Sequence, residues 1–187
     1  MSHNLVFPLL RTPDLDAVFD LADRLLALGA VAESERIDGT ELWARVPTRT
    51  ALKRLLEAVP EARVHEGIRK AAETPEDAPV PPEDDYGAYL ELPTPQHARA
   101  ATHAALRVHD RLQVHWHDLC WPAVPALGLS WTRRHAHLQV NAHHEAEDLD
   151  HPWTPHHVLY LHAGDDIHAE WLAAQVGATL IGEPYIY

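Results

Sequence analysis

Histidines with a regular spacing are the residues of this chain best suited to chemistry. The chain has 16 histidines, and 14 of them follow residue 86. From His135 to His143, a polar side chain stands at every second position, with small or aliphatic residues between. Alternation of this kind predicts a β-strand with one apolar face and one face lined by imidazoles and amides. We therefore expect a binding site on this strand.

Two more segments place histidines an even number of positions apart. His115 and His117 lie on one predicted strand, and His156 and His162 lie on another. Side chains two positions apart on a strand project in the same direction, so an H-x-H pair can hold one metal ion. Imidazole is a ligand of zinc and of other divalent transition metals. The predicted cofactor is zinc or another such ion, and the candidate ligands are His115, His117, His135, His137 and His143.

Two acidic residues near these histidines would complete a hydrolytic centre. Asp118 directly follows His117, and Glu145 lies two positions after His143. Two or three histidines, a carboxylate and one position open to water are the usual arrangement of a hydrolytic zinc site. If the protein is an enzyme, the sequence predicts a metal-dependent hydrolase in which Glu145 or Asp118 is a ligand or general base. The sequence has no H-E-x-x-H helix, no Gly-x-Ser-x-Gly elbow and no phosphate-binding loop.

Other interpretations fit the same histidine pattern. One face of an antiparallel sheet is often exposed to water, and its polar side chains then alternate without a function. Histidine also changes its charge close to neutral pH, so a row of imidazoles can form a pH-responsive surface or a contact between copies of the chain. The sequence alone leaves three alternatives open: a site for a metal or small-molecule ligand, a solvated face, and a pH-responsive or assembly surface.

The charge of the chain leads to an alternative function of another class. The formal net charge is −13 at pH 7, which argues against binding to the phosphate backbone of nucleic acids. An acidic protein of this size is suited to neutralising a basic protein partner, as a non-catalytic interaction module of the immunity or inhibitor type. The apolar segment 119–127, LCWPAVPAL, either covers the core or supplies contact surface for such a partner.

Composition favours a soluble, cytoplasmic protein. Of the 187 residues, 46% are hydrophobic, which is enough to build a core. No apolar run reaches the roughly 18 residues of a membrane helix, and the first residues do not resemble a signal peptide. The single Cys120 excludes an internal disulfide and fits a reducing compartment. Arginine outnumbers lysine 13 to 2, a bias typical of GC-rich bacterial genomes.

Residues 1–70 are expected to form a first α+β unit in the order β-α-β-β-α-β, which is that of a ferredoxin-like split βαβ unit. Asp38-Gly39 predicts a tight hairpin between the second and third strands. Thr12-Pro13-Asp14 and Thr48 predict the starts of the two helices. The predicted strands cover 4–10, 31–37, 41–46 and 62–68, and the predicted helices cover 15–26 and 48–59.

Residues 71–85 are expected to be an acidic linker, because they hold six acidic residues and four prolines. Residues 86–187 then form a second α+β unit with an extra hairpin and the histidine-lined sheet face. The predicted fold is therefore α+β, with two ferredoxin-like units and antiparallel sheets. The second unit has predicted strands at 86–92, 113–118, 135–143, 156–162 and 178–187, and predicted helices after Thr94-Pro95 and Asp165.

Overall fold

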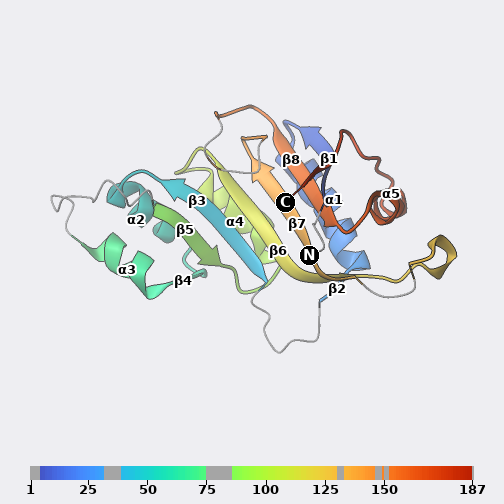
Figure 1. The fold of residues 1–187 in the computed structure, drawn as a ribbon. Helices are drawn as coiled ribbons and strands as arrows, with labels where there is room; N and C mark the ends of the chain where they lie inside the picture. The colour runs from blue at the N-terminus through green and yellow to red at the C-terminus, as the bar shows by residue number, and fades with distance from the viewer. Residues whose placement is uncertain are drawn as a thin grey trace.

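The computed structural model describes residues 5–31, 39–74, 86–129, 133–145, 149 and 152–186. Figure 1 shows how the helices and strands are arranged. Among the helices described, none is long and apolar enough to cross a membrane. In chain order, the elements are β1 (Leu5–Thr12), α1 (Leu15–Leu28), β2 (Ala30–Val31), β3 (Thr40–Val46), α2 (Arg49–Ala58), β4 (Arg63–Val64), α3 (Glu66–Glu73), β5 (Tyr86–Glu91), α4 (His97–Ala105), β6 (Leu112–Trp121), the 3₁₀ turn η1 (Pro125–Leu127), β7 (Arg133–Ala142), β8 (His157–Ala163), α5 (Asp166–Gln175) and β9 (Tyr185–Ile186).

Local sequence signals determine where three of the helices begin. Thr48 caps α2 and Asp165 caps α5, as predicted, through side chains that accept backbone N–H groups of the first turn. The first helix differs from the prediction, because its cap is Asp14 and not Thr12. The Asp14 side chain accepts from the Ala17 N–H, whereas Thr12 accepts from the Asp14 N–H.

All strands of the described residues belong to one antiparallel sheet. Its order is β4-β5-β3-β6-β7-β8-β1-β9, and β2 pairs with β6. The described residues also form five α-helices, so the predicted α+β class with antiparallel pairing is confirmed. Figure 1 shows the strands of the central part of the sheet lying side by side across the molecule.

The strand order contains two groups whose connections are consistent with split βαβ units. In β4-β5-β3-β6, the chain passes from β3 through α2 to β4 across β5, and from β5 through α4 to β6 across β3. In β7-β8-β1-β9, the chain passes from β8 through α5 to β9 across β1. The second group therefore combines the first strand of the chain with the last ones.

Strand pairing connects the two chain segments that the sequence separated. β1, from the predicted unit 1–70, pairs with β8 and β9 from the predicted unit 86–187. β3 likewise pairs with β5 and β6. Of the predicted linker 71–85, the first three residues belong to α3, and 75–85 lie outside the described residues. The two segments thus contribute neighbouring strands to one sheet.

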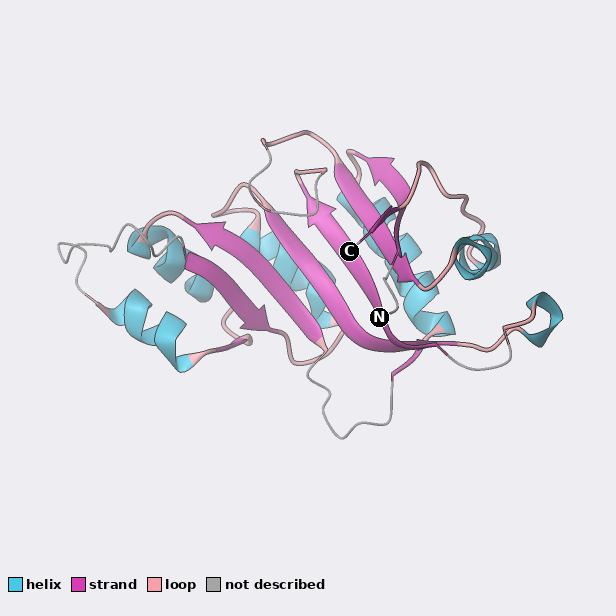
Figure 2. Ribbon diagram, viewed as in Figure 1, coloured by secondary structure: helices cyan, strands magenta, loops and turns pink. Residues whose placement is uncertain are grey.

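One face of the sheet carries the hydrophobic core. Directly paired residues on β3, β6, β7 and β8 form a continuous row on this face, and helices α1, α2, α4 and α5 contribute to the same core. Figure 2 shows α1 and α4 behind the sheet. The residues of this row are fully buried, and they are Leu42, Val114, Val140 and Leu159.

The opposite face is polar, and we call it the histidine face. The neighbouring row of paired residues, Glu41, His115, Gln139 and Tyr160, lies on it. Because successive side chains of a strand point to opposite sides, the alternation in the sequence separates these polar residues from the core. The alternation predicted for β7 is confirmed, since its apolar members are buried on the core side.

Candidate metal centre

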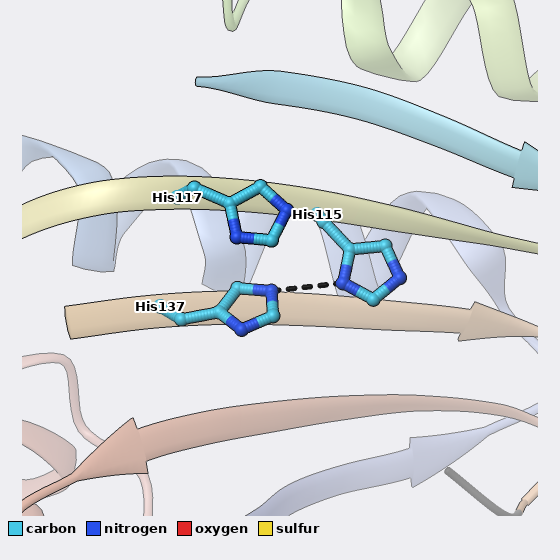
Figure 3. Close-up of side chains that lie close together, drawn as sticks. All are labelled: His115, His117 and His137. Carbon is cyan, nitrogen blue, oxygen red and sulfur yellow. Dashed lines mark hydrogen bonds between the residues drawn. The ribbon is translucent and has the colours of Figure 1, made fainter. Parts of the chain in front are cut away.

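Three histidines from two neighbouring strands converge on the histidine face. His115 and His117 come from β6, and His137 comes from β7. Figure 3 shows the three rings next to one another in front of these strands, with a hydrogen bond between His115 and His137. One ligand atom from each ring can be chosen so that all three atoms lie within 4.8 Å of one another. These three residues are called the histidine triad below.

A β-bulge in β6 places His117 opposite His137. Trp116 pairs with Leu138 and Leu119 pairs with Ala136, so that two residues of β6 stand opposite the single His137 of β7. The extra residue is Asp118, which has a positive φ of 54°. With this insertion, His117 stays on the histidine face beside His115, while the strand continues with Leu119 on the core side.

Gly39 supports the bulge from the neighbouring chain segment. The His117 N–H donates to the Gly39 carbonyl oxygen at 2.6 Å. A Cβ atom on residue 39 would lie 2.9 Å from the His117 carbonyl oxygen, so this close approach requires glycine. The sequence predicted a hairpin turn here. Asp38 lies outside the described residues, and β2 and β3 each pair with β6.

One pair of triad nitrogens is close to the spacing of a tetrahedral metal site. His115 Nδ1 lies 2.9 Å from His137 Nε2, which is a hydrogen-bond distance. Zinc binds nitrogen at about 2.0–2.1 Å, so two nitrogens of a tetrahedral site stand about 3.3 Å apart. Metal binding at this pair would require a small rotation of the two rings and removal of the proton that His115 Nδ1 and His137 Nε2 share.

Gln113 determines which nitrogen of His115 carries the proton. His115 Nε2 lies 3.1 Å from Gln113 Oε1, and an amide oxygen can only accept. The proton is therefore on Nε2, and Nδ1 presents its lone pair to the triad. A metal-binding histidine typically donates its other N–H to such a partner, which fixes the orientation of the ring.

Glu41 plays the corresponding part at His117. Its Oε2 lies 3.4 Å from His117 Nε2 and accepts the Trp43 indole N–H at 2.6 Å. The contact with His117, helped by Trp43, lowers the pKa of the Glu41 carboxyl although burial opposes the shift. Glu41 is therefore ionised at neutral pH beside the triad. Sequence reasoning missed this residue, because it lies in β3 and reaches the site only through the pairing of β3 with β6.

Burial keeps two of the triad histidines neutral. It lowers the pKa of His115 and of His137 well below the usual 6.5, and neighbouring histidines add to the shift. Neutral imidazole is the form that binds a metal. The side chains of His117 and Glu41 are 33% and 26% exposed, so one side of the site is open to solvent.

His162 extends the cluster on the next strand. Its ring stacks on that of His137 with centroids 4.1 Å apart, and its Nε2 donates to Gln139 Oε1 at 3.2 Å. Gln139 in turn donates to Asn141 Oδ1 at 2.8 Å. The amides that alternate with histidines along β7 thus hold the His162 ring in place.

The structure places the other predicted ligands differently. His143 follows the end of β7 with a positive φ of 62°, and its ring stacks on Trp153 at 5.3 Å instead of joining the triad. The backbone of His135 lies in β7, and its side chain is outside the described part of the structure.

The two predicted carboxylates lie outside the group of three. Glu145 accepts a hydrogen bond from Arg11 at 2.7 Å, and this contact lowers the pKa of its carboxyl. Asp118 occupies the bulge next to His117 and is exposed. Their catalytic roles stay predictions.

Comparison of the chain with protein-family models, with curated proteins and with solved structures finds no match. The function of the site is therefore inferred from its own geometry and chemistry. What the described residues provide is a partly buried cluster of three histidines that could hold a metal ion.

Proposed function

We propose that this protein binds one zinc ion at the histidine triad, in a centre of the hydrolytic type. The observation that carries the proposal is the convergence of three imidazoles whose ligand atoms lie within 4.8 Å of one another. Three histidines and one open position form a common catalytic zinc site. The exposed side of His117 supplies the access that the open position requires.

The surroundings of the triad favour a metal over a simple row of polar residues. His115 and His117 each have a polar partner on one ring nitrogen, Gln113 and Glu41 respectively. This leaves the Nδ1 atom of each ring for a metal. A row of solvated histidines would need neither these partners nor the burial of His115 and His137.

The chemistry of such a site would be activation of water for attack on a small-molecule substrate. Bound zinc lowers the pKa of a coordinated water to about 7. Within the chain, Glu41 is the carboxylate that we assign to this centre, in the role predicted from the sequence for Glu145 or Asp118. Its oxygen, 3.4 Å from His117 Nε2, can orient that ring and accept a proton near the open side.

Metal analysis of tag-free protein tests the proposal. We expect about one zinc ion per chain after titration of the apo protein at micromolar zinc. The variant His115→Gln/His137→Gln should lose this binding. The matched control His97→Gln/His103→Gln removes two exposed histidines of α4 and should keep it.

Circular dichroism should show that both double variants are folded, which separates loss of ligands from loss of structure. Unchanged stoichiometry in His115→Gln/His137→Gln would contradict the proposal. So would a wild-type protein that takes up no zinc, and that result would favour the acidic interaction module predicted from the charge.

A further inference from the structure

Two aromatic side chains form a corner on the histidine face beside the triad. Tyr89 of β5 and Trp43 of β3 are directly paired across the two strands. Their ring centroids lie 4.7 Å apart, and the ring planes meet at 74°. We call this pair the aromatic corner. Its two rings stand nearly at right angles, so a third ring could contact both.

Tyr89 forms the floor of the corner. A Cβ atom added to Gly87 would lie 3.3 Å from Tyr89 Cε2 and 3.7 Å from its Cζ. Gly87 is two positions earlier on the same face of β5, so the tyrosine ring lies over the glycine, close to the backbone. The tyrosine is nevertheless 49% exposed. About half of the tyrosine surface is therefore accessible to a ligand.

Trp43 forms the wall and connects the corner to the triad. Its ring centroid is 4.1 Å from that of His115, with the planes inclined by only 31°. Its indole N–H donates to Glu41, the carboxylate next to His117. The orientation of the indole is thus fixed by residues of the candidate metal centre, and the corner is continuous with it.

We propose that the aromatic corner binds a planar, uncharged aromatic ring. This ring belongs to a ligand whose donor atom binds the metal at the triad. This inference rests on the proposed zinc centre and names the class of its ligand. Aromatic rings prefer offset stacking or an edge-to-face contact at 4.5–7 Å between centroids. A ring stacked on Tyr89 would meet Trp43 edge to face, so the corner offers both contacts at once.

The charges around the corner agree with an uncharged ring. Arg45 pairs with Gly87 on one side of Tyr89, and Glu91 pairs with Glu41 on the other. One guanidinium and two carboxylates therefore border the floor, so an anionic ring is disfavoured. A phosphate-bearing ligand is further disfavoured by the net charge of −13.

Two hydroxamates that differ only in a phenyl ring test this inference. Propionohydroxamate and 3-phenylpropionohydroxamate carry the same zinc-binding group, and calorimetry on zinc-loaded protein gives the affinity of each. We expect the phenyl compound to bind about two- to tenfold more tightly, the advantage of one aromatic contact. Tyr89→Ala should remove this advantage, and Tyr89→Phe should keep it.

The control Val108→Ala removes an exposed apolar side chain elsewhere and should change nothing. Zinc stoichiometry should be the same in all variants. Equal affinities for the two hydroxamates in the wild type would contradict ring binding at the aromatic corner, and so would a phenyl advantage that persists in Tyr89→Ala. Neither result would contradict the proposed zinc centre. A protein that takes up no zinc would instead contradict the proposed function, and with it the inference about the aromatic ligand.

Discussion

Two groups of histidines lie near opposite ends of β7, and their ring nitrogens are used differently. In the triad, His115 Nδ1 and His137 Nε2 face each other at 2.9 Å. At the other end, His143, His156 and His157 form what we call the strand-end group. There, His143 Nδ1 contacts the Thr154 carbonyl oxygen at 3.1 Å, and His157 Nδ1 accepts the His143 N–H at 3.2 Å.

The difference shows that the hydrogen-bond partners of the histidines, and not the number of histidines, decide whether their ring nitrogens are available to a metal ion. The rings of His143 and His157 bind the backbone of the loop that follows β7, so these nitrogens stabilise a turn. The triad rings contact one another and the side chains of Gln113 and Glu41, so a metal can replace one weak contact without breaking the backbone structure. Among the described residues, the triad is the group whose ligand atoms converge.

Acid should destabilise both groups, and this is the largest effect that we expect. Burial, with neighbouring histidines adding to it, lowers the pKa of His162 next to the triad and of His157 in the strand-end group from 6.5 to about 4. The unfolded chain takes up protons near pH 6.5 and the folded chain only near pH 4. Stability is therefore complete above about pH 6.5 and falls as the pH drops toward 4. For the buried His162, the shift corresponds to about 3 kcal/mol.

Urea unfolding of the apo protein between about pH 7 and pH 4.5 measures this loss. His162→Gln and His157→Gln should each flatten the dependence of stability on pH, and the exposed His97→Gln should not. Added zinc sharpens the comparison, because at neutral pH it should stabilise His157→Gln but not His115→Gln/His137→Gln. Equal unfolding free energies of the wild type at about pH 7 and pH 5 would contradict the expected role of the buried imidazoles.

The features that the sequence predicted correctly depend on local patterns. Period-two alternation identified β7 and the side on which its histidines lie, and the residues before α2 and α5 identified their starts. The α+β class followed from the order of such elements. Local patterns fail where a strand ends, because alternation continues to His143 in the sequence while the backbone turns there with a positive φ.

The rest of the site depends on strand order, which no local pattern contains. Glu41 and Trp43 reach the triad only because β3 lies beside β6 in the sheet. No pattern in the sequence predicts the bulge at Asp118. Yet this bulge directs the side chains of Leu119 and Trp121 toward the core, where both are buried. Part of the apolar segment 119–127 therefore continues β6 beyond the predicted strand 113–118.

Removing the charge of Glu41 should weaken zinc binding without abolishing it. Partners of metal-bound histidines typically contribute 10- to 100-fold to metal affinity, so we expect a loss of roughly this size in Glu41→Gln. The matched change Glu145→Gln removes the carboxylate that contacts Arg11 and the strand-end group, and zinc affinity should stay unchanged. Competition with a chromogenic chelator measures both. A larger loss in Glu145→Gln than in Glu41→Gln would reverse the assignment of the carboxylate.

The smallest effect is expected at Asp118, where the backbone and the side chain can be tested separately. Glycine adopts the positive φ of this bulge without strain, so Asp118→Gly should change the unfolding free energy by less than about 1 kcal/mol and leave zinc binding intact. Asp118→Val should cost about 1–2 kcal/mol, because a branched side chain disfavours this conformation. It should also weaken zinc binding, since the bulge sets His117 opposite His137. If Asp118→Gly instead weakened zinc binding as much as Asp118→Val, the Asp118 carboxylate itself would be a ligand of the metal, in addition to the three histidines.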